Sequence, residues 1–142
     1  MASLAYLSGV HDILRGNIDC DTDTFKMMLV GSSYVANGIT HTKRSDVTAE
    51  CTGIGYTAGG IPVTATVTKD TANNRVDMAL TAPDLVGVNF DGTGARAGVV
   101  YKSRGGAASA DELLAYVDFG SDKDPNGGTL AFNFTSPLRI QA

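Results

Sequence analysis

Short segments in which apolar and polar residues alternate, separated by turn-forming residues, constrain the fold of this chain most strongly. Between Ile61 and Lys69 the apolar residues occupy every second position and threonines alternate with them, which is the pattern of a half-buried β-strand. Arg75–Leu80 repeats the alternation after a polar turn, Asp70–Asn74, so the two segments predict a hairpin. Further strands are predicted at Phe25–Val30, Val86–Phe90, Arg96–Lys102, Glu112–Phe119, Leu130–Thr135 and Leu138–Ile140.

These strand patterns recur with a turn signal about every ten residues, which favours an antiparallel β-sandwich over other all-β arrangements. No sustained alternation of helices and strands accompanies them, so a doubly wound parallel sheet is not expected. At 142 residues the chain is long enough for one domain with a real core. The prediction is therefore a single domain spanning residues 1–142, mainly β, folded as a jelly-roll-like antiparallel β-sandwich with one short N-terminal α-helix.

The N-terminal segment, residues 1–16, carries the helix prediction. Leu4, Leu7 and Leu14 recur at helical spacing within Ala2–Arg15, which predicts one apolar stripe. Gly16 stands where a helix commonly stops. The stripe fits a helix packed on the sheet, and it also fits an arm that docks on a partner protein.

A long polar segment, residues 35–52, follows the first predicted strand, and a loop of this length in a compact domain is usually functional or a contact arm. Its small basic cluster is offset by Asp46 and Glu50. A helix at a chain end and a long loop are both free to reach a neighbour. The candidate partner-contact residues are therefore Leu4, Tyr6, Leu7, Tyr34, His41, Lys43 and Arg44.

The glycine-rich stretch Gly53–Gly60 raises the question of a phosphate-binding loop. No Gly-Lys-Ser/Thr follows it, and the next segment is a strand rather than a helix whose N-terminus could hold a phosphate. We expect the glycines to serve the backbone, because they permit positive φ and close approach at the start of a strand. Tyr56 is expected to anchor this corner by packing its ring inward.

Residues that could support catalysis or metal binding do not form a complete pattern. Asp19, Asp21 and Asp23 are weak metal candidates: they resemble the start of a calcium loop whose sixth and twelfth positions, Thr24 and Val30, do not fit. Neither a nucleophile elbow nor a zinc-type cysteine pair is present. The sequence therefore predicts a protein that is not an enzyme and has no cofactor.

The charge and hydropathy of the chain argue against nucleic-acid and membrane partners, and its two cysteines are expected to be unpaired. The net charge is −4 and no basic block occurs, so direct nucleic-acid binding is not expected. No apolar run is long enough to span a bilayer, and Met1–Val10 lacks the features of a secretory signal. Without such a signal, Cys20 and Cys51 are expected to be free thiols.

Four segments in this order give the chain a likeness to a known class: the helix exit Gly16–Asp19, the strand region Asp23–Tyr34, the glycine stretch Gly53–Gly60, and Ala115–Gly120. Together they are similar to small structural proteins of tailed bacteriophages. The resemblance implies a virion component assembled in the bacterial host cytoplasm. It is most like a capsid decoration or cement protein on the capsid surface that joins neighbouring copies of the major capsid protein. It implies no catalytic residues.

Two points stay open at the level of sequence. A tail, neck or fibre component with a host-surface or connector role is the alternative, with residues 34–51 and 103–110 as binding loops. A homo-oligomer, dimer or trimer, is expected because an open sandwich has strand edges to cover.

Overall fold

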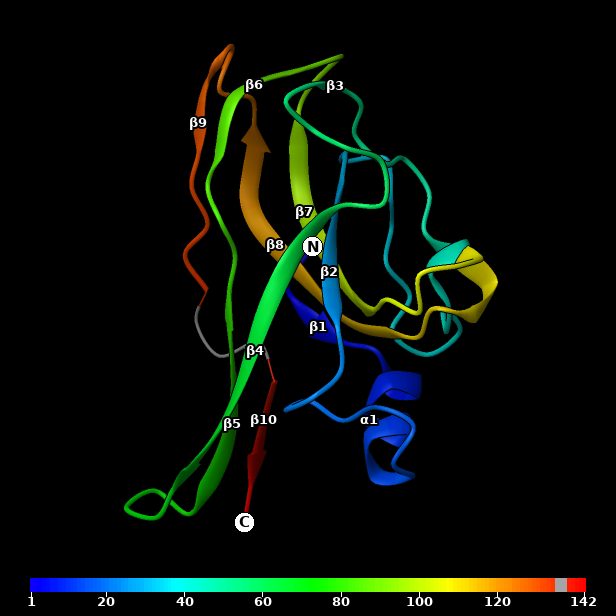
Figure 1. The fold of residues 1–142 in the computed structure, drawn as a ribbon, viewed down its shortest axis with the longest axis vertical. Helices are drawn as coiled ribbons and strands as arrows, with labels where there is room; N and C mark the ends of the chain where they lie inside the picture. Colours follow the sequence, from blue (N-terminus) through cyan, green and yellow to red (C-terminus); the bar gives the residue numbers. More distant parts are fainter. Residues whose placement is uncertain (135–137) are drawn as a thin grey trace.

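The computed structural model describes residues 1–134 and 138–142, whose strands form two antiparallel sheets (Figure 1). The larger sheet has the strand order β1-β8-β7-β2-β4-β5-β10, and the smaller has the order β3-β6-β9. The sheets form a nearly closed, barrel-like sandwich. The mainly β fold with one short helix near the N-terminus is confirmed. The elements are β1 (Leu4–Ala5), α1 (Leu7–Leu14), β2 (Phe25–Val30), the 3-10 helix η1 (Arg44–Asp46), β3 (Gly53–Ile54), β4 (Ile61–Asp70), β5 (Arg75–Thr81), β6 (Leu85–Phe90), β7 (Ala95–Lys102), the 3-10 helix η2 (Ala108–Ala110), β8 (Leu113–Lys123), β9 (Gly128–Leu130) and β10 (Leu138–Gln141).

The central strands β2 and β7 and the first part of β8, Leu113–Tyr116, are buried on both faces, because a separate apolar cluster covers each side of the larger sheet. Met27 and Leu29 of β2 belong to the cluster shared with the smaller sheet. Met28 and Val30 alternate with them and face a second cluster, which includes Tyr6 and residues of the long loop after β2. The strand predicted at Phe25–Val30 is confirmed, and its continuous apolar run follows from this two-sided burial.

The N-terminal segment differs from the predicted helix. Leu4 and Ala5 form β1 and pair with Tyr116 and Ala115 of β8, so α1 begins only at Leu7. The predicted stripe is also wrong, because Leu7 and Leu14 are exposed. Gly9 instead faces the sheet, where a Cβ would overlap the Leu113 carbonyl. The helix therefore packs through its smallest residue and comes very close to β8.

The end of the helix agrees with the sequence. Gly16 has φ +79°, and the N–H groups of Gly16 and Asn17 donate to the carbonyls of Ile13 and Asp12. A left-handed glycine with such returning hydrogen bonds is the common way to stop a helix.

The long loop, residues 35–52, is less solvated than its sequence suggested. Tyr34, Ala36 and Cys51 are buried, and Glu50 forms an isolated bridge with Val30 of β2. The loop folds over the outer side of the larger sheet and carries η1 on the right of Figure 1, next to η2. Ala36 and Val47 of this segment, with Tyr34 just before it, therefore cover the second apolar cluster, whereas Cys51 joins the first.

The glycine stretch works as a backbone corner, as predicted. Gly60 has φ +97°, and a Cβ there would collide with the Met27 carbonyl of β2. The Tyr56 hydroxyl donates to Glu50 Oε1 at 2.8 Å and accepts the Leu29 N–H at 3.0 Å. The Tyr56 ring packs edge-on against Phe90. The corner therefore fastens the loop to β2 just before β4 begins.

The predicted hairpin is formed by β4 and β5, which pair from Thr64–Thr81 to Asp70–Arg75. It projects below the body of the molecule, and β10 adds to its edge (Figure 1). The final predicted strand is thus confirmed, with Leu138 opposite Met78. The strand predicted at Leu130–Thr135 is not: β9 ends at Leu130, and Thr135 lies outside the described residues.

Candidate partner-binding surface

The two segments predicted to contact a partner lie side by side. The Leu7 N–H at the start of α1 donates to the Gly38 carbonyl at 2.8 Å. One residue further on, the Ser8 hydroxyl lies 3.5 Å from the His41 carbonyl oxygen, although 33 positions separate these two residues in the chain. The beginning of the helix and the tip of the loop therefore form one continuous surface.

Three large apolar side chains of this surface are exposed. Leu7 on α1 is 60% exposed, and the loop residues Val35 and Ile39 are 67% and 75% exposed. We call these three residues and the backbone that joins them the helix–loop surface. Single exposed apolar residues are common, but several on two adjoining segments are typical of a contact site.

A chain of hydrogen bonds fixes the tip of the loop to the protein interior. The Tyr6 and Tyr34 hydroxyls lie 2.9 Å apart, and the Tyr34 hydroxyl is 2.9 Å from His41 Nδ1. The Asn37 backbone N–H also points at this nitrogen, at 3.2 Å. Because a backbone N–H can only donate, Nδ1 accepts, and the Tyr34 hydroxyl supplies a second donor. Burial raises the pKa of Tyr6 and, to a smaller extent, of Tyr34, so both phenols stay neutral.

This arrangement corrects part of the predicted contact set. Tyr6 is fully buried and Tyr34 nearly so, so neither ring is available to a partner in this fold. His41 is half-buried and engaged with Tyr34 and Asn37. Of the N-terminal candidates, Leu4 is half-buried beside the loop and Leu7 remains open. The tyrosines position the surface rather than form it.

The two basic candidates of the loop are held by carboxylates that lie far away in the sequence. Arg44 Nε donates to Asp111 Oδ2 at 2.7 Å, and Lys43 Nζ lies 3.5 Å from Glu112 Oε1. The Arg104 guanidinium donates to both oxygens of Glu112. Asp111 and Glu112 are buried, so this five-residue cluster clamps the loop and η1 to the start of β8. We call it the ion-pair clamp.

The contacts of the clamp favour an ionised Glu112. Burial is the largest single influence and opposes this charge, but the hydrogen bonds from Arg104 and from the Glu112 backbone N–H, together with the positive charges of Lys43 and Arg104, outweigh it and leave the pKa of Glu112 below its usual value. Arg44 also lies over the Tyr101 ring at 5.1 Å, a cation–π contact. The sequence suggested that Asp46 and Glu50 balance the basic residues. Asp46 instead accepts the N–H groups of Thr42 and Lys43. The partners of Lys43 and Arg44 are Glu112 and Asp111, which no local pattern in the sequence connects with the loop.

The three aspartates after α1 form a self-contained turn. Asp19 Oδ1 accepts the Asp21 N–H at 2.9 Å, and Asp23 Oδ2 accepts the Asp19 N–H at 2.8 Å. Lys102 Nζ pairs with Asp23 at 2.8 Å. Within residues 1–134 and 138–142, no group of three or more potential metal ligands converges on one point. The carboxylates of Asp19 and Asp23 are occupied by backbone capping and one ion pair.

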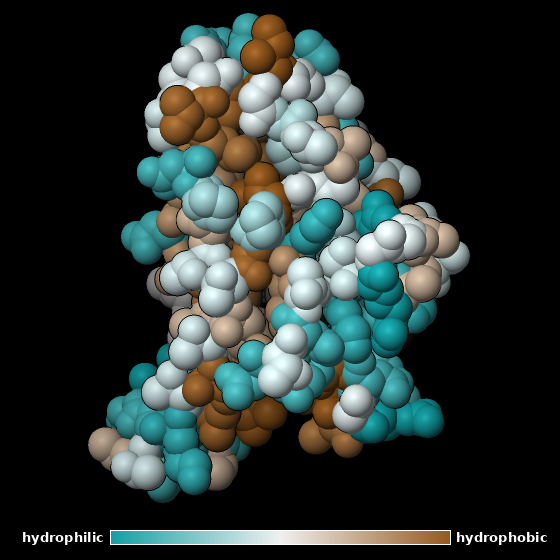
Figure 2. All heavy atoms as spheres, in the orientation of Figure 1, coloured by the Kyte–Doolittle hydropathy of each residue, from teal (hydrophilic) through white to brown (hydrophobic). Residues whose placement is uncertain are grey.

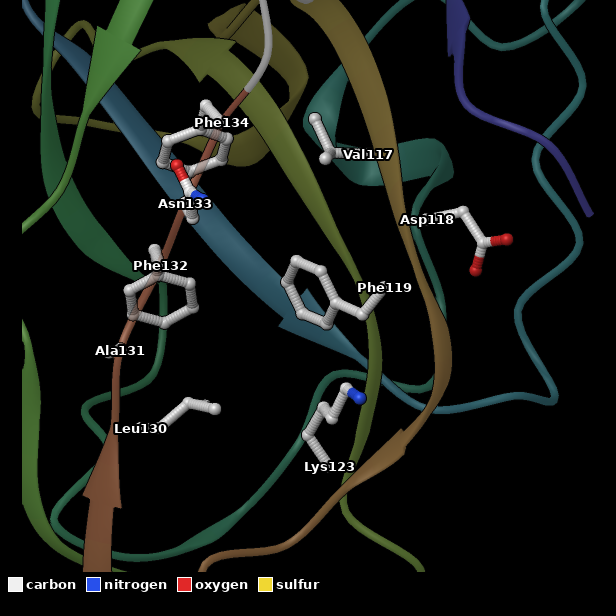
Figure 3. A pocket seen from close by; sticks show the side chains of 9 residues that line it. All are labelled: Val117, Asp118, Phe119, Lys123, Leu130, Ala131, Phe132, Asn133 and Phe134. Carbon is white, nitrogen blue, oxygen red and sulfur yellow. The ribbon is translucent and has the colours of Figure 1, made fainter.

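An aromatic pocket of about 280 Å³ opens between β8 and the segment that follows β9 (Figure 3). The rings of Phe119 and Phe132 point toward one another with centroids 6.1 Å apart, and Phe134 stacks beyond Phe132 at 6.3 Å. Asp118 points away from the pocket and pairs with Arg96 at 2.9 Å. The pocket is thus an apolar gap at the rim of the two sheets, and Lys123 is the charged side chain nearest to its rings.

Comparisons of the chain with protein-family models, with curated proteins and with solved structures each found no match. No helix in the described part of the chain has the length and hydropathy needed to cross a membrane. The two cysteines are free thiols, as predicted; Cys51 is buried, and burial raises its pKa to about 11.

Proposed function

We propose that this chain is a non-enzymatic structural protein of a phage particle that binds the outside of an assembled capsid and joins neighbouring copies of the major capsid protein. The helix–loop surface carries the proposal. Leu7, Val35 and Ile39 are open to solvent, while the backbone N–H groups of Leu7, Ile39 and Thr40 already donate within the chain. Such a surface offers a partner apolar area in which these N–H groups stay bonded when binding removes water.

The rigidity of this surface suits a cementing role. The tyrosine–histidine chain holds the first part of the loop and the ion-pair clamp holds its middle, so little side-chain and backbone freedom is lost when the tip between them binds. A protein that binds only the assembled lattice stabilises that lattice by mass action. Repetition over a symmetric shell multiplies the effect of a small contact area.

The decisive experiment adds purified protein to phage particles that lack it and measures co-sedimentation and the temperature at which the heads release their DNA. The proposal expects saturable binding at a fixed ratio to the major capsid protein and a higher release temperature. Leu7→Asp and Ile39→Asp should each weaken binding roughly tenfold or more, because they place a charge in an apolar contact.

Val86→Asp is the matched control, since Val86 is an equally exposed apolar residue on β6, away from α1 and the loop. It should bind as the unmodified chain does. Binding to purified tails instead of heads would overturn the capsid proposal in favour of a tail, neck or fibre role. Unchanged binding of both the Leu7 and Ile39 variants would remove the helix–loop surface from it.

A further inference from the structure

A second apolar surface, distinct from the helix–loop surface, lines a groove between the exit of α1 and the projecting hairpin. The groove has a volume of about 380 Å³. Its walls are Ile13 and Ile18 on the helix side and Val67, Val76, Leu138 and Ile140 on the sheet side. In Figure 2 brown atoms lie on both sides of the notch between the hairpin and α1. Ile140 is 50% exposed, and Val67 and Val76 are exposed as well.

The groove has a defined electrostatic character. Asp19 is the one charged residue that lines it among the described residues. The hydrogen bond from the Asp21 N–H is the main cause that lowers the pKa of Asp19, so its carboxylate is ionised at neutral pH. A complementary occupant therefore presents an apolar side chain next to a cation.

The last turn of α1 carries this combination. Leu14 is 78% exposed and is followed by Arg15, which is also exposed. Arg15 makes no ion pair with another described residue. Both residues sit between Ile13 and Gly16, which line the groove of the same molecule. Projection and groove are thus neighbours at one end of the helix.

We propose that two copies of this chain form a two-fold symmetric dimer in which Leu14 of each copy enters the groove of the other and Arg15 pairs with Asp19 of the other copy. A two-fold interface uses the same surface twice, so each contact is repeated when the copies are exchanged. Leu14 lies next to the groove of its own molecule, so a single two-fold rotation brings the Leu14 of each copy to the groove of the other. The dimer covers Val67, Val76 and Ile140, and it does not depend on the proposed capsid role.

Sedimentation equilibrium of the full chain, from micromolar to millimolar protein, tests the proposal. The unmodified chain should pass from monomer to dimer within this range. Leu14→Asp and Arg15→Glu should each raise the dissociation constant roughly tenfold or more, with unchanged circular dichroism. Leu7→Asp is the control, because Leu7 shares the helix face with Leu14 but lies about 10 Å away along the axis; dimerisation should persist.

A mixing experiment identifies the ionic contact. Arg15→Glu alone sets two carboxylates against each other across the interface, and Asp19→Lys alone sets two cations against each other, so each variant should be monomeric at concentrations at which the unmodified chain is largely dimeric. A mixture of the two should form heterodimers, because both contacts between one copy of each variant then join opposite charges. One contact joins the two new side chains, a glutamate and a lysine. The other joins the two unchanged side chains, Arg15 and Asp19. Where Asp19→Lys does not fold, Asp19→Asn retains the oxygen that caps the turn and should still weaken the dimer.

Three results would overturn the proposal. The first is an unmodified chain that stays monomeric throughout the range, which leaves the groove to a different partner. The second is dimerisation of Leu14→Asp and Arg15→Glu with unchanged dissociation constants. The third is a mixture of the folded charge variants that stays monomeric.

Discussion

Arg44 Nε donates to Asp111 Oδ2 at 2.7 Å across 67 residues of chain. The bond joins η1, in the middle of the long loop, to Asp111, which lies between η2 and β8. Asp111 is almost completely buried, and its other oxygen accepts the Arg104 N–H. This one carboxylate therefore ties together the loop, the segment after β7 and the start of β8, which is why the helix–loop surface is held in place.

Arg44→Ala should destabilise the protein by about 3 kcal/mol, because it leaves the buried Asp111 carboxylate without its cation. Arg139→Ala is the matched control. It breaks the Arg139–Asp77 pair, which has a Nε–Oδ1 distance of 2.5 Å but lies on the exposed hairpin, so it should change stability little. Urea unfolding measures both; equal losses would contradict a special role for the buried pair.

Tyr56→Phe should cost about 2 kcal/mol, because the buried Leu29 N–H then loses its acceptor and Glu50 loses a donor. The ring contact with Phe90 is preserved by this substitution. Tyr116→Phe provides the comparison, since the Tyr116 ring is buried even more completely than that of Tyr56 but its hydroxyl has no hydrogen bond to the described residues. If both variants unfold at the same urea concentration, the hydroxyl of Tyr56 does not anchor the corner.

The sequence predicted the parts of the fold that depend on local patterns. Phe25–Val30 was recognised from its composition, the β4–β5 hairpin from its alternation, and the corner at Gly60 from its glycines. Each of these signals is a property of a short stretch of sequence, because it depends on the conformational preferences of residues that are close neighbours in the chain. The fold class followed from the number and spacing of such segments.

The N-terminus shows what local patterns cannot predict. Leu4 and Ala5 pair with β8, more than a hundred residues away, and this pairing overrides their place in a helical stripe. The helix then turns Gly9, not Leu7, toward the sheet. Burial of Tyr6 follows from the same docking. A deletion of residues 1–7 would therefore remove core, so point substitutions at Leu7 test partner binding more cleanly.

The candidate site was predicted in outline only. Helix and loop were chosen separately because each was free to reach a neighbour, and the structure places them together. The ion-pair partners of Lys43 and Arg44 could not be assigned from sequence, because they lie far along the chain, at positions 112 and 111. The exposed Val35 and Ile39 were missed, since apolar residues inside a polar loop carry no periodic signal.

The protein should lose stability above about pH 10. Burial, with a hydrogen bond to Tyr34, raises the pKa of Tyr6, and burial raises that of Tyr56. The unfolded chain releases these protons near pH 10, whereas the folded state keeps them, so stability is complete below that pH and falls as pH rises. Each phenol contributes a loss of roughly 1.4 kcal/mol per pH unit.

Tyrosinate absorbance should rise together with the loss of circular dichroism, and the stability of the Tyr6→Phe variant should decline less steeply with pH. Full tyrosine ionisation in an intact fold would contradict this prediction.

Gly60→Ala should destabilise the protein by at least about 4 kcal/mol, at the upper end of single substitutions. Two causes combine here. The positive φ of Gly60 disfavours any side chain, and the new Cβ would overlap the Met27 carbonyl. That carbonyl belongs to β2, which is paired on both sides and cannot shift without disturbing β4 and β7.

Gly105→Ala separates the two causes, because Gly105 has a similar φ, +79°, but faces open space; its cost should be only about 1–2 kcal/mol. Chemical unfolding of the two variants measures the difference. Similar losses for both would mean that β2 yields to the added methyl group and that the corner is not fixed by close backbone approach.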